Sequence, residues 1–308
     1  MSKITVIGSF VMDNVATMDR FPSPGESVIG LSLNNYPGGK GANQCVAIAR
    51  LNGDCEMVGM LGNDENGRFF LRLLKNENIK TQHIFTCNES TAIAQIQINK
   101  EGENRICLIP GANHKFDFEH IDLIDEIIKS TDLIVLQYEL RIDVTIELIK
   151  RAHKYGTKIL LNPAPAAKLP EEIIGLVDYI TPNESELSQI TNMPIDSEEQ
   201  IINAAKKLLS FGCKNVIATL GGKGALLVNE QTTKFIKGYK VKAIDTVGAG
   251  DSFNGALAVA LIEGKPIEEA INFANAMGAL TVQKQGAIPS LHTRNEVEEF
   301  IKNNKAGE

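Results

Sequence analysis

The sequence contains no tryptophan, no apolar run of membrane-spanning length and no pair of cysteines at metal-binding spacing. A transmembrane helix needs about 20 apolar residues in succession, so no membrane partner is expected. The five cysteines include no Cys-x-x-Cys pair and the five histidines no His-Glu-x-x-His pattern, which argues against zinc sites of either kind. The first residues have the pattern of a strand and not of a secretion signal, so a cytoplasmic location is expected.

Positive charge is in the minority, with 31 Lys and Arg residues against 38 Asp and Glu, for a net charge of -7. Surfaces that bind nucleic acid are usually basic, so no nucleic-acid partner is expected. A small anionic ligand remains possible, because it needs positive charge only locally. Hydrophobic residues make up 43% of the chain and charged residues 22%, the mixture of an ordinary globular protein.

Short β-branched apolar segments alternate with longer segments of helical periodicity along most of the 308 residues. The predicted buried strands are 4–7, 133–136, 158–161 and 215–218. The predicted helices are 42–52, 66–77, 117–129, 143–155, 198–211, 251–263 and 266–284. This alternation predicts a doubly wound α/β core in which helices cover a mostly parallel sheet. No repeat or linker divides the chain, so we expect a single domain over 1–308.

Two segments depart from this pattern. Residues 91–99 alternate between polar and apolar side chains, and residues 12–37 contain three prolines around short extended pieces. Such alternation is typical of a half-exposed strand. We therefore expect a small sheet outside the core, formed by segments of about 12–40 and 90–110, that acts as a lid or an interface.

Three glycine-rich turns, at 38–41, 221–224 and 248–251, adjoin predicted helices or strands. Glycine at such a turn allows a close approach by a ligand, and a helix start offers unpaired N–H groups. A phosphate is therefore the expected ligand. The Walker motif is absent, because neither Lys40 nor Lys223 precedes a hydroxyl residue. The Rossmann fingerprint is also absent after the first strand.

Asp251 is the most informative acidic residue, because it lies where a predicted helix begins. One interpretation is an N-cap, the ordinary role of Asp at such a position. The other is a general base that accepts a proton from a substrate hydroxyl while neighbouring N–H groups stabilise a transferring phosphoryl group. The two roles do not exclude each other.

Several motifs occur together in a recognisable order. They are Gly38-Gly-Lys-Gly-Ala-Asn-Gln44, Asn162-Pro-Ala-Pro165, Thr181-Pro-Asn-Glu-Ser-Glu186, Thr219-Leu-Gly-Gly-Lys-Gly224, Asp245-Thr-Val-Gly-Ala-Gly-Asp-Ser-Phe-Asn-Gly255 and Gly286-Ala-Ile-Pro-Ser290. Over essentially its whole length the chain resembles the ribokinase (PfkB carbohydrate kinase) family. The resemblance implies a three-layer α/β/α core with a small β-sheet lid, and a homodimer formed through that lid.

The resemblance also implies a reaction, the transfer of the ATP γ-phosphate to the 5-hydroxyl of a pentose with Asp251 as the base. The implied anion hole is the backbone of Gly248, Ala249 and Gly250, and the implied sugar contacts are Asp13, Gly39, Lys40, Asn43 and Glu139. Asn183 and Glu186 would organise Mg²⁺ and the phosphates, and ATP would lie against Thr219, Gly221, Gly222, Lys223, Gly224, Gly250 and Asn275. A monovalent cation, usually K⁺, would bind near Asp245, Val247, Thr281, Lys284, Gly286 and Ser290.

Each of these residues also has an ordinary interpretation when taken alone. Asn43 would then simply start a helix, Asn183 would be a turn residue after proline, and Lys223 would be a solvated charge. A nucleoside or hexose kinase, or a sugar-binding protein without catalysis, are the alternatives at the level of function. Loss of the base would favour the last of these, whereas Asp251 is present.

Val11 departs from the pattern of the family, in which ribokinases usually carry an Asn that binds a secondary sugar hydroxyl. Valine cannot pair a hydroxyl, and an unpaired buried polar group costs about 1–3 kcal/mol. Deoxyribokinases in this family carry an apolar residue at this place. We therefore expect 2-deoxy-D-ribose to be accepted or preferred, unless water or a neighbouring group compensates and D-ribose remains the substrate.

Overall fold

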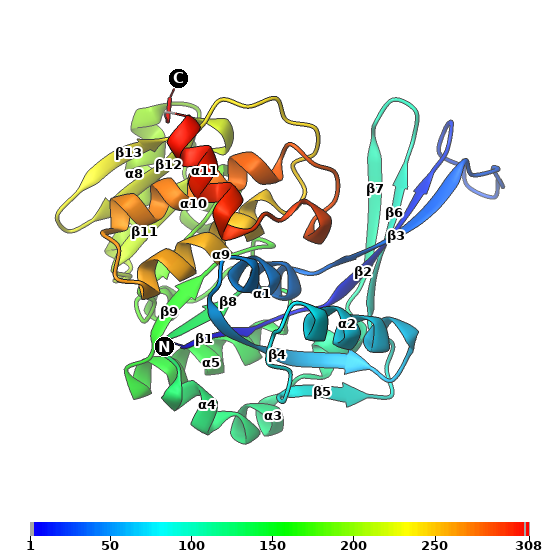
Figure 1. Ribbon diagram of the computed structural model, residues 1–308, viewed down its shortest axis with the longest axis horizontal. Helices are drawn as coiled ribbons and strands as arrows, with labels where there is room; N and C mark the ends of the chain where they lie inside the picture. Colours follow the sequence, from blue (N-terminus) through cyan, green and yellow to red (C-terminus); the bar gives the residue numbers. More distant parts are fainter. Residues whose placement is uncertain (1–2, 305, 308) are drawn as a thin grey trace.

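The computed structural model describes residues 3–304 and 306–307. Figure 1 shows a large α/β body from which a small, separate sheet projects to one side. Within the described residues no helix is both long enough and apolar enough to cross a membrane.

The described part of the body is built on a nine-stranded sheet, in which the first strand lies third from one edge. Its order is β13-β12-β11-β10-β9-β8-β1-β4-β5. The bounds are β1 (Lys3–Ile7), β4 (Asp54–Gly62), β5 (Ile84–Cys87), β8 (Leu133–Leu136), β9 (Lys158–Leu161), β10 (Tyr179–Ile180), β11 (Asn215–Thr219), β12 (Gly224–Asn229) and β13 (Thr233–Lys237). Neighbouring strands pair in parallel from β5 to β11, and β12 and β13 add an antiparallel edge.

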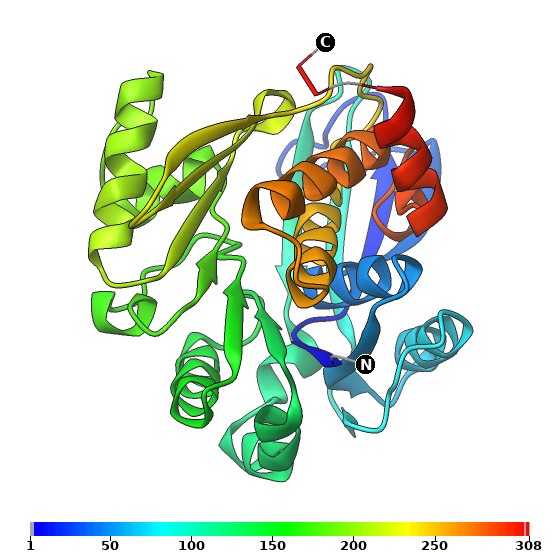
Figure 2. The same cartoon turned by 60° about the vertical axis from the view of Figure 1, so that its left-hand side comes forward.

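Helices cover both faces of this sheet, as the turned view in Figure 2 shows. One face packs against α1 (Lys40–Arg50), α2 (Glu65–Asn76), α9 (Ala249–Ile262), α10 (Ile267–Thr281) and α11 (Arg294–Asn303). The other packs against α3 (Phe118–Leu123), α4 (Asp125–Ser130), α5 (Ile142–Tyr155), α6 (Glu171–Ile174), α7 (Glu184–Thr191) and α8 (Glu198–Ser210). Successive side chains of a strand point to opposite faces, so Val6 joins the first core and Ile7 the second. The α/β fold and the apolar strands predicted from sequence are confirmed.

Several predicted helix boundaries need correction. The helix expected over 117–129 is two short helices, because the chain leaves helical geometry at Ile124, where φ is -105° and ψ is 8°. The helix expected from Asp251 begins two residues earlier, at Ala249, and the one expected to reach 284 ends at Thr281. Asn183 and Glu186 form a capping box that starts α7, a helix the periodicity did not predict.

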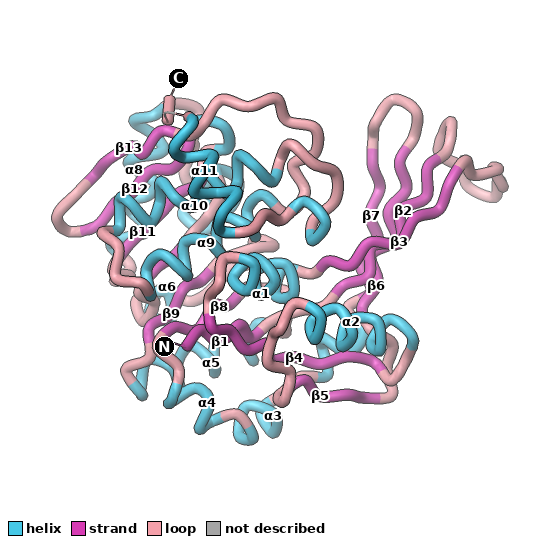
Figure 3. Tube along the Cα trace, viewed as in Figure 1, coloured by secondary structure: helices cyan, strands magenta, loops and turns pink. Residues whose placement is uncertain are grey.

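The small sheet has the order β3-β2-β6-β7 and comes from two separate parts of the chain. Its strands are β2 (Val11–Thr17), β3 (Ser32–Gly38), β6 (Ala92–Ile98) and β7 (Asn104–Ile109), drawn as the magenta strands that project from the body in Figure 3. Two antiparallel hairpins are joined by a parallel pairing of β2 with β6. The sheet outside the core that the sequence predicted is therefore present.

Polar side chains of the body hold the base of the small sheet. Asn113 Oδ1 accepts the Phe10 N–H at 3.1 Å, and its amide nitrogen donates to the Phe10 carbonyl at 2.9 Å. On the other hairpin, the Asp64 carboxylate accepts both the N–H and the hydroxyl of Thr91, each at 2.7 Å. These bonds fix where β2 and β6 leave the body.

Candidate active site

The site lies between the neighbouring strands β1 and β8. After β1 the chain adds β4 and β5 on one side of it, and from β8 onward it adds strands on the other side. Parallel sheets bind ligands outside the carboxyl ends of their strands at such a switch point. Ser9 follows β1 here and Glu139 follows β8. The Ser9 hydroxyl donates to Glu139 Oε2, and the Lys40 backbone N–H donates to the same oxygen at 2.8 Å. The Glu139 carboxylate is thus fixed at this end of the sheet.

The glycines of the 38–41 turn allow close packing of backbone against backbone. Gly39 has a φ of 90°, and a Cβ there would lie 2.6 Å from the Val11 nitrogen. A Cβ at Gly41 would lie 2.4 Å from the Ser9 nitrogen, and one at Gly38 would lie 2.9 Å from Asp13 Oδ2. These glycines therefore bring α1 against the start of β2. The phosphate expected at this turn from sequence stays a prediction.

Asp251 is the third residue of α9 and is buried, with its carboxylate directed toward α1. Asn43 Nδ2 donates to Oδ2 at 2.8 Å, and Gln44 Nε2 donates to Oδ1 at 3.0 Å. The helix N-cap is Gly248, at a φ of 78°, and the described side chains supply no capping hydrogen bond. The interpretation of Asp251 as an N-cap is therefore wrong, because this residue lies inside the first turn of a 14-residue helix. In that turn the Ala249 N–H donates to the Thr246 carbonyl at 3.3 Å.

Several other carboxylates and one ammonium group lie near the Asp251 carboxylate. Burial, together with the nearby carboxylates of Glu139 and Asp251, raises the pKa of Asp13 to about 7. Burial alone opposes the charge on Lys40, but Asp251, Glu139 and Glu186 outweigh it and hold the Lys40 pKa above its ordinary value. The region is thus an acidic pocket with an embedded ammonium group, and we call Asp13, Lys40, Glu139, Glu186 and Asp251 the cleft cluster.

Asn183 and Glu186 make a compact unit at the start of α7. Asn183 Oδ1 accepts the Glu186 N–H at 2.8 Å, while Glu186 accepts the Asn183 N–H and Nδ2, each at 2.9 Å. Burial raises the Glu186 pKa, and Lys40 acts in the opposite sense. A carboxylate has more lone pairs than these bonds use, so the two residues fit Mg²⁺ that keeps waters in its coordination shell.

A cavity of about 630 Å³ adjoins the start of α9. Asn183, Thr219, Gly221, Gly222, Gly224, Gly250 and Asn275 line it, as do Tyr239, Lys240 and Phe253, which the sequence did not single out. Lys223 is exposed and outside the lining, and Glu186 is also outside it. Asn275 Nδ2 donates to the Ile236 and Lys237 carbonyls, each at 3.3 Å, which ties α10 to β13.

The segments expected to hold a monovalent cation are brought together beside α9. Asp245 accepts the Val247 N–H at 3.0 Å and the Gly286 N–H at 2.9 Å. The hydroxyls of Thr281 and Ser290 donate to carbonyls of their own segments, and the Lys284 N–H donates to the Thr281 carbonyl. A monovalent cation ligated partly by backbone carbonyls stays a prediction for these loops. The described residues contain no cluster of three or more His, Cys, Asp or Glu able to hold a metal ion.

The sequence missed a set of buried amides that support Asp251. Gln44 contacts Asp251, Gln137 and Asn162, while Asn254 contacts Thr181 and the Gly250 carbonyl. Gln137 and Asn162 directly follow strands that the sequence did predict, and this position is the signal that could have found them. Their partners lie far away in the chain, which periodicity does not reveal.

Comparison with known proteins agrees with this architecture. Residues 1–294 match the family described as pfkB family carbohydrate kinase. The chain is 38% identical over 299 residues to a ribokinase of Haemophilus influenzae, covering 97% of this chain and 98% of the relative. It is 34% identical over 305 residues to a deoxyribokinase of Salmonella typhi, covering 98% and 99%. The structure of Arabidopsis thaliana ribokinase complexed with ribose and ATP matches with a TM-score of 0.91 at 32% identity, covering 98% of this chain and 99% of that one.

Proposed function

Because this chain belongs to the pfkB family of carbohydrate kinases, we propose that it transfers the γ-phosphate of ATP to the 5-hydroxyl of a pentose. The sugar is D-ribose or 2-deoxy-D-ribose. The observation that carries the proposal is Asp251, a buried carboxylate next to the open first turn of α9 and the adjoining cavity. The similarity to a ribokinase complexed with ribose and ATP supports both ligands.

The proposed chemistry needs one base and one anion hole. Asp251 accepts the proton of the sugar 5-hydroxyl as the oxygen forms its bond to the γ-phosphorus and the bond to the β-phosphate oxygen breaks. The N–H groups of Gly248, Ala249 and Gly250 stabilise the negative charge on the transferring group. Bound Mg²⁺ would neutralise phosphate charge beside Asn183 and Glu186.

The sugar lies, in this proposal, between the small sheet and the carboxyl ends of β1 and β8. Asp13, Glu139 and Asn43 face that space and accept hydrogen bonds from sugar hydroxyls. Asn43 Oδ1 supports this, because it is buried and has no hydrogen-bond partner within the described residues, while Nδ2 is already bonded to Asp251. Gly39 and Lys40 close the same space from the start of α1.

A pentose panel tests the proposal. ADP release is measured with ATP, Mg²⁺ and K⁺ on D-ribose, 2-deoxy-D-ribose, other pentoses, hexoses and nucleosides. We expect the highest kcat/KM with one of the two named pentoses. A higher value with a hexose or a nucleoside would make the pentose assignment wrong, and no turnover with any sugar would favour a binding protein.

Val11 carries the choice between the two pentoses. It is buried at the base of the small sheet, where Ala92 and Ala94 complete an apolar surface with it. A 2-hydroxyl facing this surface has no partner, which supports acceptance of 2-deoxy-D-ribose. The apolar pocket itself discriminates by only about 10²-fold, so activity with D-ribose should persist.

Substitution at this position separates the two sugars. Val11→Asn should raise the ratio of kcat/KM for D-ribose over 2-deoxy-D-ribose by about 10- to 100-fold, because a buried hydroxyl gains a partner. Val15→Asn, four residues further along β2 on the same face, is the matched control and should leave the ratio unchanged. A strong preference of the wild type for D-ribose would contradict the role of Val11.

We further propose a homodimer in which two small sheets cover each other. Residues directly opposite in the ladder share a face, so Val15, Ile96, Ile106 and Leu108 continue the face that carries Val11. Ile106 and Leu108 are 60% and 47% exposed, and such an apolar face is typical of an interface. Light scattering should give twice the 33.5 kDa mass, and Ile106→Lys should give a monomer.

We also propose that K⁺ binds beside α9, supported by the convergence of the Asp245 and Gly286 segments. The ion would hold the loop that precedes the anion hole. Replacing K⁺ with a bulky organic cation should therefore lower kcat, and Asp245→Ala should reduce the difference between the two salts. Equal rates in both salts for the wild type would contradict a cation site.

A further inference from the structure

Gln44 lies between the proposed base and the sheet, completely buried on the first turns of α1. Its amide nitrogen donates to Asp251 Oδ1 at 3.0 Å and to Asn162 Oδ1 at 3.1 Å. Its amide oxygen accepts from Gln137 Nε2 at 2.7 Å. Each atom of this amide that can form a hydrogen bond therefore has a protein partner.

These partners allow only one orientation of the Gln44 amide. If the amide were turned over, its oxygen would face the oxygens of Asp251 and Asn162, and its nitrogen would face the Gln137 amino group. Both arrangements place like partial charges together in a buried site, where an unmade hydrogen bond costs about 1–3 kcal/mol. The donor directed at Asp251 is thus specified by the surrounding residues.

The residues that orient Gln44 lie on rigid elements. Gln137 follows β8 and Asn162 follows β9, at the carboxyl ends of adjacent parallel strands. Asn162 Nδ2 in turn donates to the carbonyl of Thr181, at the end of β10, at 3.3 Å. Three neighbouring strand ends therefore support the amide that holds the base.

We propose that Gln44 is a positioning residue for Asp251, and that Gln137 orients Gln44. Asn43 binds one carboxylate oxygen of Asp251 and Gln44 binds the other, so the carboxylate cannot rotate about its Cβ–Cγ bond without losing a hydrogen bond. The remaining lone pairs are then aimed at the sugar hydroxyl in every turnover. This inference rests on the proposed function, because it assigns a role that only a kinase with Asp251 as its base would need.

Gln44→Met keeps the length of the side chain and removes the donor. It should lower kcat by about 10- to 100-fold, because a hydrogen bond to a charged group is lost, while the KM for ATP stays unchanged. Gln137 bonds to Gln44 and not to Asp251, so Gln137→Met should also lower kcat, but by a smaller factor. If Gln44→Met fails to fold, Gln137→Met still tests the arrangement.

A matched control separates positioning from general loss of packing. Thr5 lies in β1, and its hydroxyl donates to the Thr131 hydroxyl at 3.0 Å in the buried core, away from the carboxyl end of the strand. Thr5→Val should lower the melting temperature as much as the glutamine variants do, with wild-type kcat. An equal fall of kcat in Thr5→Val would overturn the positioning role.

The decisive measurement is a double-mutant cycle with Asp251→Asn. If Gln44 acts through the base, adding Gln44→Met to Asp251→Asn should leave the residual kcat unchanged. A further fall equal to that of the single variant would overturn the inference. Wild-type kcat in Asp251→Asn would contradict the proposed function itself, whereas wild-type kcat in Gln44→Met alone, with a low Asp251→Asn, would contradict only the positioning role.

Discussion

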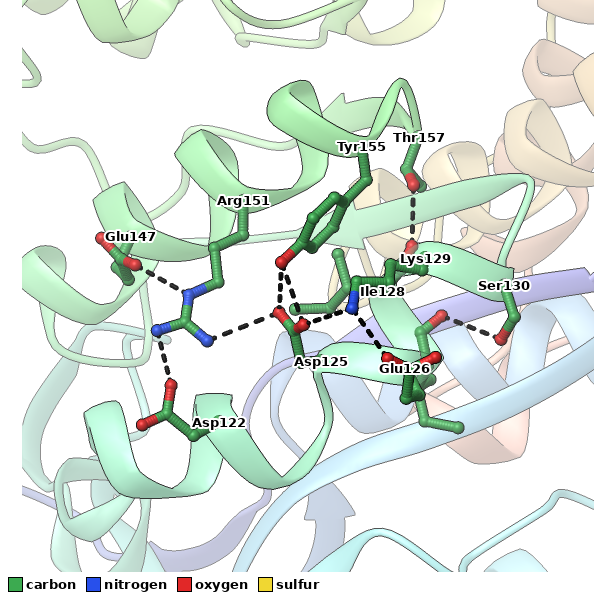
Figure 4. A network of polar contacts seen from close by, with 11 residues as sticks. Asp122, Asp125, Glu126, Ile128, Lys129, Ser130, Glu147, Arg151, Tyr155 and Thr157 are labelled. Carbon is green, nitrogen blue, oxygen red and sulfur yellow. Dashed lines mark hydrogen bonds and ion pairs between the residues drawn. The ribbon is translucent and has the colours of Figure 1, made fainter.

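Two clusters of charged residues on this molecule are arranged in opposite ways. The surface network on α3, α4 and α5, drawn in Figure 4, comprises Asp122, Asp125, Glu126, Lys129, Glu147, Arg151 and Tyr155. Each carboxylate there contacts a cation. The cleft cluster places the carboxylates of Glu139, Glu186 and Asp251 around one ammonium group, that of Lys40, and adds a fourth carboxylate, Asp13, near two of them.

The directions of the pKa shifts differ accordingly. In the surface network the hydrogen bond from Lys129 lowers the pKa of Asp125. In the cleft cluster burial and like charges raise the pKa of Asp13 to about 7. The surface network therefore contributes slightly to stability, whereas the cleft cluster reduces the stability of the unliganded protein and keeps polar groups available to a ligand.

The largest effect should come from Asp251→Asn, which removes the proposed base from the cleft cluster while keeping its size. General-base catalysis contributes about 10²- to 10⁴-fold, so kcat should fall by that factor. The measurement is ADP release with saturating pentose and ATP. Asp125→Asn is the matched control in the surface network and should keep the wild-type kcat. A residual kcat above about one tenth of the wild type would contradict the role of Asp251 as base.

Much of the fold follows from local sequence patterns. The strands at 4–7, 133–136, 158–161 and 215–218 are mostly apolar on both faces, a pattern typical of buried strands, and the structure contains all four. The break at Ile124 escaped prediction because Ile121, Ile124 and Ile128 are buried across it and preserve the helical period. The start of α7 could have been predicted from the Asn183 and Glu186 pattern alone.

The site was less predictable, because its bonds join distant segments. Asn43 and Gln44 lie 208 and 207 positions from Asp251. Only the packing of α1 against α9, at the contact between Ala47 and Gly255, brings them together. No local pattern encodes that contact, so the sequence indicated Asp251 as a base but did not reveal its supporting amides.

The next effect is a pH dependence that separates wild type from Asp13→Asn. The Asp13 pKa is about 7 in the folded protein and near 3.8 when unperturbed, so the folded state binds the extra proton between these values. The contribution of Asp13 to the free energy of unfolding should then fall as pH rises from 4 to 8, by roughly 2–4 kcal/mol at about 1.4 kcal/mol per pKa unit.

Urea unfolding of the unliganded protein at several pH values measures this fall. The Asp13→Asn variant lacks the titrating group, so its stability advantage over wild type should grow through pH 7. Asp122→Asn is the control and should run parallel to wild type over that range. Parallel curves for Asp13→Asn and wild type would contradict the raised pKa of Asp13 and the repulsion by Glu139 and Asp251 that contributes to it.

A smaller effect is expected from Arg151→Met in the surface network. The guanidinium contacts Glu147 at 2.8 Å, Asp122 at 2.6 Å and Asp125 at 3.5 Å. Partly exposed pairs contribute little individually, so the loss should be about 1 kcal/mol and should shrink with added salt. Urea unfolding at low and high salt measures it. A gain in stability would mean that the charges of the surface network destabilise the folded protein, as those of the cleft cluster are expected to do.

The smallest effect should come from Glu126→Gln, at the rim of the surface network. Glu126 is 86% exposed and contacts Lys129 at 2.7 Å, but Lys129 also contacts Asp125 at 2.8 Å and keeps that partner. Its removal should therefore shift the melting temperature by no more than about 1 °C and leave kcat unchanged. Removing a carboxylate from the cleft cluster should change both the activity and the pH dependence of stability. Removing the Glu126 carboxylate should change neither, because Lys129 keeps Asp125 as its partner and Glu126 has no proposed ligand.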